Sequence, residues 1–454
     1  MKNKPNIILI NCDDLGWGDP GCYGHPLHAT PHIDRLAEEG VRFTDFYMAS
    51  PVCSPSRGAM MTGCYPARIG FSEFEGKWVL FPGQPVGLNP EEQTIAGLLK
   101  EAGYATKLIG KWHCGDQSEF LPTAHGFDEF YGLPYSNDMA RQAGLEHQWP
   151  PLPLMRNGEV VEQQPDQRSI TSRYVEESVR YLRDHRDGPF FLYFAHMHVH
   201  LPHYVPERFV AESKNGVYGA AVANIDWATG VLLAELKDLG IDEDTIVIFT
   251  SDNGSRNDFG ASNGPLRGTK GTTWEGGQRV PCIVRRPGTV PAGRTCSEIA
   301  TAMDFLPTFA QIAGVSPRTE RPIDGKDILP LMLAEPEAQS PHEAFFYHHR
   351  NRLEAVRTRR WKLHVRKDDS EMLELYDLIA DPGETTDVAA AEPAVVAELS
   401  ALLDGFRTEL GDTATGAPGS GCRPIGRVPV GRPLTEYDPT HPYFMAEYDL
   451  ADRG

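Results

Sequence analysis

The chain has 454 residues, 40% of them hydrophobic and 23% charged, and its formal net charge at pH 7 is −20. This length leaves room for roughly two or three domains with a large core. A protein this acidic is a poor general binder of nucleic acid or of anionic membranes, because attraction to phosphate groups supplies most of that affinity. We therefore expect no nucleic acid and no membrane among its partners.

The N-terminal segment predicts a buried strand. Residues 6–11 form a short apolar run, without the longer apolar core and small-residue cleavage site of a secretory signal. No stretch approaches the roughly 20 uninterrupted apolar residues of a membrane span. Eight cysteines are too few in 454 residues for a disulfide scaffold. We expect a cytoplasmic protein whose cysteines, Cys53 apart, are free thiols, or an exported one if a leader was removed.

Strand and helix patterns alternate along the first half of the chain. Short apolar runs predict strands, and amphipathic periodicity bounded by Pro or Gly predicts helices. In chain order we expect strand 6–11, helix 30–40, helix 93–102, strand 104–110, helix 171–187, strand 189–196, helix 219–239 and strand 245–250. Apolar strands separated by helices are typical of a parallel α/β sheet covered on both faces.

The pattern changes after about residue 340, where a small antiparallel sheet with a terminal helix is expected. Short strand-like runs occupy 344–348, 353–359, 362–365 and 373–378, and a helical pattern covers 391–409. The predicted fold class is therefore α/β, with a large, mixed but mostly parallel sheet sandwiched by helices in residues 1–340. Residues 341–454 form a smaller α+β subdomain with an irregular Gly-, Pro- and Thr-rich tail from about residue 411.

Two predicted strands end in acidic pairs. Asp13-Asp14 follows the first strand, and Asp252-Asn253 follows strand 245–250. Ligands of open α/β sheets bind beyond the carboxyl ends of the strands, so these four side chains can meet at one point. Three carboxylates and an amide carbonyl are hard oxygen ligands, which suit Ca²⁺ or Mg²⁺. An Asp at a strand end is also common as a helix cap or turn residue, and each pair alone leaves both interpretations open.

A further motif is Cys53-Ser54-Pro55-Ser56-Arg57, which follows a strand-like segment and begins a helical one. A cysteine at a helix N-terminus lies where negative charge is favoured and anions bind. Arg57, one turn further on, can pair with an oxyanion formed at residue 53. By itself the motif also fits a buried thiol before a helix that starts with proline.

Cys-x-Pro-x-Arg followed by Thr62-Gly63 resembles the signature of the type I sulfatases, a formylglycine-dependent family of the alkaline phosphatase superfamily. Other motifs of that family occur in family order, and the resemblance spans about residues 5–390. They are Gly103–His113, Pro134–Ser136, His198–Pro202, Lys270–Gly277 and Glu374–Glu384, besides the two acidic pairs. Gly126–Phe130 and Pro134–Ser136 are similar to the branch that contains arylsulfatase A and N-acetylgalactosamine-6-sulfatase. The resemblance implies an alkaline-phosphatase-like fold.

The resemblance also implies a sulfuric ester hydrolase. In the family this cysteine is oxidised to formylglycine (3-oxoalanine) by a formylglycine-generating enzyme, which we expect as a partner. Asp13, Asp14, Asp252 and Asn253 would hold Ca²⁺, with Mg²⁺ as the alternative, and residue 53 as the aldehyde hydrate would add an oxygen ligand. One hydroxyl of the hydrate would attack sulfur and the other would then expel sulfate. An unmodified cysteine has one nucleophilic atom and cannot take the second step.

The same resemblance implies roles for the surrounding cations. Arg57 and Lys111 would stabilise the hydrate and its oxyanion, and His113 would be the base that breaks down the sulfated intermediate. Lys270 and His200 would contact the sulfate and the bridging oxygen, and one of them would be the acid for the leaving group.

The substrate implied is a small anionic sulfate ester. Ser136 matches a sulfate contact of the family, and a sulfated carbohydrate is the expected natural substrate, with aryl sulfates as artificial ones. The tail after about residue 410 matches no family motif. We expect it to be an arm that forms a homo-oligomer or a lid that reaches the pocket of another subunit.

Three alternatives stay open. A phosphate or phosphonate monoester hydrolase of the same superfamily would use the same residues. An inactive Ca²⁺-dependent glycan-binding protein would keep Cys53 as a thiol. Finally, His196, His198 and His200 alternate along a predicted strand, and on one face of it they would suit a zinc ion.

Overall fold

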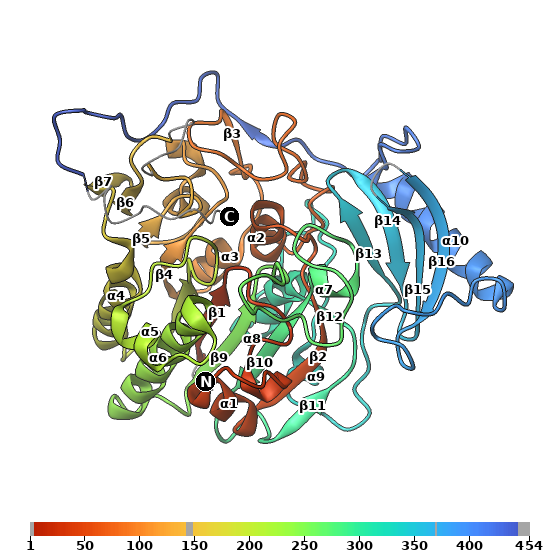
Figure 1. Ribbon diagram of the computed structural model, residues 1–454, viewed down its shortest axis with the longest axis horizontal. Helices are drawn as coiled ribbons and strands as arrows, with labels where there is room; N and C mark the ends of the chain where they lie inside the picture. The colour runs from red at the N-terminus through yellow and green to blue at the C-terminus, as the bar shows by residue number, and fades with distance from the viewer. Residues whose placement is uncertain (1–3, 142–148, 368–369, 444–454) are drawn as a thin grey trace.

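The computed structural model describes residues 4–141, 149–367 and 370–443, and it shows a large sheet flanked by helices beside a smaller sheet (Figure 1). Within these residues the large sheet has 11 strands in the order β11-β2-β10-β9-β1-β8-β4-β5-β6-β7, with β12 paired to β2. In that order the strands are Arg294–Cys296, Val41–Tyr47, Arg279–Arg285, Thr245–Ser251, Asn6–Cys12, Phe190–Ala195, Ala105–Lys111, Glu129–Leu133, Pro153–Arg156, Glu159–Gln163 and, for β12, Ala300–Thr301.

The centre of the large sheet is parallel. Strand β1 pairs in parallel with β8 and β9, and β4 pairs in parallel with β5 and β8. Strands β2, β10, β6 and β7 add antiparallel pairs toward the two edges. All seven residues of β1 are buried, which explains why the sequence there is a continuous apolar run rather than an alternating one. The predicted mixed, mostly parallel sheet is confirmed.

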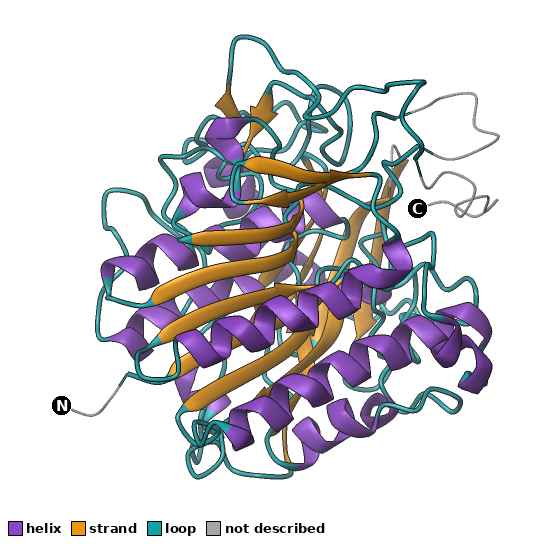
Figure 2. Ribbon diagram, turned by 90° about the vertical axis from the view of Figure 1, so that its left-hand side faces the viewer, coloured by secondary structure: helices purple, strands orange, loops and turns teal. Residues whose placement is uncertain are grey.

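Helices cover both faces of this sheet. Successive residues of β1 point to opposite sides, so Ile7 and Leu9 belong to one core and Ile8 and Ile10 to the other. One core is completed by α2, α3 and α8, and the other by α1, α4 and α6. Figure 2, which views the molecule from the side of α4 and α6, shows helices crossing the strands. The α-helices named here are Cys53–Thr62, Ile95–Glu101, Phe305–Ala313, Pro31–Glu38, Ile170–Asp184 and Gly216–Asp238.

Apart from the C-terminal helix α10 (Pro393–Leu410), the remaining helices of the described residues are short connections. They are α5 (Glu207–Glu212), α7 (Glu275–Gln278), α9 (Leu329–Met332) and the 3₁₀ turns Gly21–Tyr23, Ser118–Phe120, Pro122–His125, Gln167–Ser169 and Ala302–Asp304. Among the described helices, α6 alone is long and apolar enough to cross a membrane, and 72% of its apolar window is buried inside the protein. It therefore has the surroundings of a core helix.

A smaller antiparallel sheet follows the large one along the chain. Its order is β13-β14-β15-β16, and α10 (Pro393–Leu410) packs on β14 and β15. The strands are Phe345–His349, Arg352–Arg357, Trp361–Lys367 and Ser370–Asp377. The predicted C-terminal sheet and helix are confirmed, whereas the division into two domains at residue 340 stays a prediction.

The C-terminal tail is irregular, as expected, and lies against the chain's own large domain. It runs back across the top of the view in Figure 1, and β17 (Gly426–Arg427) pairs with β3 (Val86–Gly87). The guanidinium of Arg423 binds Glu92 at 2.8 Å. The tail therefore extends from the small sheet to the large domain of the same chain.

Candidate active site

The two acidic pairs meet at the carboxyl edge of the large sheet. Strands β1 and β9 are parallel neighbours with Cys12 opposite Ser251, so the residues after both strands come together. The amide N–H of Asp14 donates to Asp252 Oδ1 at 3.2 Å. The side-chain amide of Asn253 donates to Asp14 Oδ1 at 2.8 Å. Asp14 has a positive φ of 61°, and this turn directs the chain out of the strand at the site.

Buried cations balance the carboxylates. Lys111 Nζ lies 2.5 Å from Asp13 Oδ2, and Arg57 Nε lies 2.7 Å from Asp252 Oδ2. Burial alone would raise the pKa of Asp13, but Lys111, His200 and Arg57 hold it well below its usual range. For Asp252, burial outweighs Arg57 and raises the pKa to about 7. The site is thus a dense array of opposite charges shielded from water.

The residues present fit a hard divalent cation. Asn253 Oδ1 is buried and has no hydrogen-bond partner among the described residues. One ligand atom each from Asp13, Cys53 and Asp252 lies within 4.8 Å of the others, and the same holds for Asp14, Cys53 and His200. A cation bound by these carboxylates would also give the Asn253 oxygen a partner, and an oxygen-rich set of this kind suits Ca²⁺ or Mg²⁺.

Cys53 lies where its sequence context predicts, as the first residue of α2. Its thiol is buried and donates to Asp13 Oδ1 at 3.6 Å. Burial raises the pKa of the thiol, and this effect is larger than the opposite effect of the nearby Lys111 and Lys270, which lower it. The unmodified side chain therefore stays protonated and is a poor nucleophile. Arg57, one turn further along α2, points into the site and also donates to the carbonyl of Lys111 at 2.9 Å.

Lys270, His200 and the hydroxyl of Ser136 line the open side of the site. Lys270 Nζ lies 2.8 Å from Asp14 Oδ2, and His200 Nε2 lies 3.8 Å from the same atom. Lys111 Nζ donates to Ser136 Oγ at 3.1 Å. Burial lowers the pKa of His200, and Lys270 lowers it further.

His113 is held as a neutral base. Its Nε2 lies 3.0 Å from the carbonyl oxygen of Leu80, which can only accept, so Nε2 carries the proton. Its Nδ1 is buried and has no partner among the described residues. Burial lowers the pKa of His113 well below its usual value, and the neighbouring Lys111 lowers it further. The ring therefore keeps a lone pair on Nδ1.

Five of the residues described above, Cys53, His113, Ser136, His200 and Lys270, line one cavity of about 330 Å³. The structure brings together all eleven side chains that the sequence predicts for the site. The cavity wall also includes residues that the sequence analysis missed: Trp78, Val79, Phe81, Asp138, Met139 and Arg256. Arg256 lies only three residues beyond Asn253 in the sequence, and this closeness to the acidic pair could have suggested that it belongs to the site. Nothing in the sequence around Trp78 suggests a place at the cavity.

The premise of a zinc site at three alternating histidines is wrong. Strand β8 ends at Ala195, and the following residues form an irregular segment, so the histidines do not share a strand face. His196 packs edge-on against Phe194 at 4.6 Å between ring centroids. Within the described parts of the chain, no candidate metal group contains two of these histidines. His200 alone faces the active site.

Family models match most of the chain. The model described as Sulfatase matches residues 5–315, and the model described as N-sulphoglucosamine sulphohydrolase, C-terminal, matches residues 269–409. The fold and the site thus lie within regions of recognised family sequence.

Known proteins resemble the chain over most of its length. It is 38% identical to arylsulfatase A of Homo sapiens over 451 residues, covering 88% of this chain and 87% of that protein. It is 40% identical to N-acetylgalactosamine-6-sulfatase of Canis lupus familiaris over 375 residues, covering 79% and 71%. The crystal structure of Ps i-CgsB in complex with k-i-k-neocarrahexaose matches with a TM-score of 0.80 and 32% identity, covering 89% of this chain and 92% of that one. The chain belongs to the sulfatase family.

Proposed function

We propose that this sulfatase hydrolyses sulfate esters of small carbohydrates, with formylglycine at residue 53 and a bound Ca²⁺, and accepts aryl sulfates as artificial substrates. The observation that carries the proposal is the meeting of Cys53 with Asp13, Asp14, Asp252 and Asn253 at the base of one cavity that His113, His200 and Lys270 line. Only a substrate group with several anionic oxygens makes full use of so many cations and donors.

Asp13, Asp14, Asp252 and Asn253 would hold the cation, which would neutralise sulfate oxygens and lower the pKa of a hydroxyl that it binds. The partnerless Oδ1 of Asn253 supports this ligand set. Mg²⁺ is the alternative ion, since its ligands are also hard oxygens.

Formylglycine hydrate at residue 53 would supply one hydroxyl for attack on sulfur and a second for release of sulfate. The unmodified thiol, which burial keeps protonated, suits neither task. Cys53 is only 1% exposed, so a formylglycine-generating enzyme would have to act before the chain folds. We therefore propose such an enzyme as a partner during synthesis.

The chain's own residues would bind the sulfate and move the protons. Lys111 and Lys270 would bind sulfate oxygens from two sides, and Ser136 would add a hydrogen bond. His113 Nδ1, with its lone pair directed into buried space, would take a proton from a hydroxyl on residue 53. Lys270 or His200 would give a proton to the leaving oxygen.

A carbohydrate is the substrate class that the cavity rim supports. Trp78 lines the cavity and is 40% exposed, which leaves its apolar ring available for stacking on a sugar. Two relatives point the same way, because one is named N-acetylgalactosamine-6-sulfatase and the other was solved in complex with k-i-k-neocarrahexaose.

Release of free sulfate from a panel of sulfated mono- and disaccharides tests the proposal. We expect turnover of at least one sugar sulfate, and faster turnover of an aryl sulfate than of the matched aryl phosphate. Preference for the phosphate would replace the proposal with a phosphate or phosphonate monoester hydrolase. Mass spectrometry of the Cys53 peptide from the native host should detect formylglycine. An unmodified thiol with no turnover would instead indicate a glycan-binding protein.

We also propose a cytoplasmic location and test it by cell fractionation. All eight cysteines lie in the described residues and none forms a disulfide, which supports a reducing compartment. An oligomer formed through the C-terminal tail stays a prediction, which light scattering with and without the tail would check.

A further inference from the structure

The segment that carries Lys270 is an irregular connection between β9 and α7, and we define residues 267–275 as the Lys270 loop. Its backbone makes two hydrogen bonds to the large domain close to Lys270. Lys270 N–H donates to the carbonyl of Ser255 at 2.8 Å, and Gly271 N–H donates to the carbonyl of Pro51 at 2.9 Å. Both hydrogen bonds hold the middle of the loop, and Thr273, which follows it, is bonded to the small sheet.

The small C-terminal sheet supports this part of the loop. The hydroxyl of Thr273 donates to Glu354 Oε2 at 2.5 Å, and Lys362 Nζ donates to the carbonyl of Thr273 at 2.9 Å. The amide of Glu275 donates to Glu384 Oε2 at 2.8 Å. Glu354 and Lys362 lie on β14 and β15, and Glu384 follows β16. All five side chains are fully buried.

Two further contacts involve Arg267 at the beginning of the loop and Trp274 near its end. The guanidinium of Arg267 donates to the carbonyl of Glu384 at 2.9 Å and stacks on Trp274 at 3.7 Å from the ring centroid. The Trp274 ring in turn lies 4.2 Å from the ring of His364, on β15. The small sheet therefore contacts the loop on both sides of Lys270.

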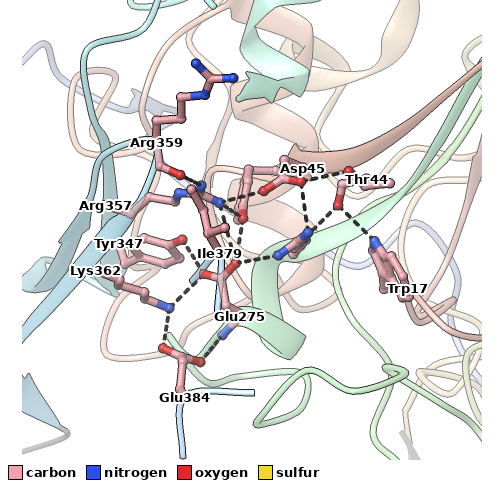
Figure 3. A network of polar contacts seen from close by, with 12 residues as sticks. Trp17, Thr44, Asp45, Glu275, Tyr347, Arg357, Arg359, Lys362, Ile379 and Glu384 are labelled. Atoms are coloured by element: carbon pink, nitrogen blue, oxygen red, sulfur yellow. Dashed lines mark hydrogen bonds and ion pairs between the residues drawn. The ribbon is translucent and has the colours of Figure 1, made fainter. Parts of the chain in front are cut away.

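Charges inside this contact are mutually compensated. Figure 3 shows Lys362 between Glu275 and Glu384, at 3.0 Å and 2.9 Å. Glu275 also accepts from the hydroxyls of Tyr347 at 2.6 Å, on the small sheet, and Tyr47 at 2.5 Å, on the large one. Loss of one partner from such a buried set leaves an uncompensated charge, so the arrangement has one strongly preferred geometry. That geometry places the Lys270 loop relative to both sheets.

We propose that the small sheet positions Lys270 for catalysis, and that Glu354, Lys362 and Glu384 are positioning residues that act through the Lys270 loop. The inference rests on the role proposed above for Lys270. A lysine that binds sulfate must be held to within a fraction of an ångström, because small misplacements of catalytic groups cost large factors in rate. The small sheet is then part of the catalytic apparatus as well as a packing partner.

Thr273→Val and Thr273→Ser test the proposal, because valine keeps the shape of threonine and serine keeps its hydroxyl. We expect Thr273→Val to lower kcat/KM for an aryl sulfate by about tenfold or more, and Thr273→Ser to restore it to near the wild-type value. Leu403→Ala in α10 is the matched control, because it destabilises the buried core of the small sheet without contacting the loop. It should lower the unfolding temperature and leave kcat/KM, measured well below that temperature, unchanged.

Full activity of Thr273→Val, or an equal loss in Leu403→Ala, would overturn the proposal, since the small sheet would then contribute stability alone. Lys270→Met separates this failure from failure of the role of Lys270. If the wild type cleaves sulfate esters and Lys270→Met is equally active, the role assigned to Lys270 is wrong. If Lys270→Met is inactive while Thr273→Val is unaffected, the role holds and the positioning does not.

Discussion

At residue 53, two features of the surroundings work together. The buried thiol is kept protonated, and the lone pair of His113 Nδ1 has no partner among the described residues. The thiol offers a single nucleophilic atom, whereas a formylglycine hydrate would offer two hydroxyls, and His113 could take a proton from one of them. Both features support the formylglycine proposed above at residue 53.

Cys53→Ala should abolish sulfate-ester hydrolysis, with a loss above about 10⁴-fold, because no aldehyde can form at alanine. Initial rates with an aryl sulfate would measure the loss. Cys422→Ser, which changes an exposed cysteine remote from the cavity, should keep full activity. Turnover by Cys53→Ala near the wild-type rate would show that the enzyme works without formylglycine.

Removal of the cation with a chelator should abolish activity and lower the unfolding temperature. Without the ion, the carboxylates of Asp13 and Asp14 repel one another, and binding to the folded state alone stabilises it. Scanning calorimetry would measure the shift, and added Ca²⁺ should reverse it. Asn253→Ala, which lacks the partnerless oxygen, should need more Ca²⁺ for the same recovery. An unfolding temperature indifferent to chelator and Ca²⁺ would contradict a metal site here.

At the scale of single elements, a side chain of α6 caps the N-terminus of α1. The carboxylate of Asp226 accepts from the amides of His32 and Ile33, both at 2.9 Å, and so satisfies two N–H groups in the first turn of α1. Asp226→Ala should lower the free energy of unfolding by about 1–2 kcal/mol, measured with urea. Asp226→Asn keeps an acceptor oxygen and should lose much less. Equal losses in both variants would show that the charge matters rather than the acceptor.

The same residue gives a pH dependence with a definite sign. Burial raises the pKa of Asp226 to about 7. The folded state then holds a proton that the unfolded chain has already released, so this residue's contribution to stability falls as the pH rises from about 4 to 7. Urea unfolding across that range should show a shallower decline in Asp226→Asn than in the wild type. Parallel pH profiles would contradict the raised pKa.

Sequence periodicity predicted the elements whose apolar pattern is local. The expected helix 171–187 is α4 (Ile170–Asp184), and the expected strand 189–196 is β8 (Phe190–Ala195). Strand β10 was missed because Pro281 interrupts its pattern, and in the structure the register with β2 shifts between Val280 and Cys282. A proline is tolerated at such an irregularity in the pairing. The irregularity itself can be seen only once the neighbouring strand β2 is in place.

In the whole molecule, the tail connects the small sheet to the large domain. Gly426 packs so closely that a Cβ there would lie 2.8 Å from Phe120 Cε1 and 2.9 Å from the carbonyl oxygen of Gly87. Gly426→Ala should therefore detach this part of the tail and speed its cleavage in limited proteolysis. Gly405→Ala, in α10, where a Cβ would meet nothing within 4 Å, is the matched control and should be cleaved like the wild type. Unchanged cleavage of Gly426→Ala would mean that the tail contact adjusts without cost.

The sequence by itself determined the candidate site residues and the edge of the sheet at which they meet, since Asp13 and Asp252 directly follow apolar strands and Cys53 begins a helix. These are local features, and elementary strand geometry brings them together. Tertiary structure alone decided the exposed ring of Trp78 at the cavity, the return of the tail, and the contacts of Glu275. Each depends on side chains from distant parts of the chain, for which adjacent residues carry no pattern. The buried charge of Glu275 is stable only because Tyr47, Lys362 and other remote groups surround it.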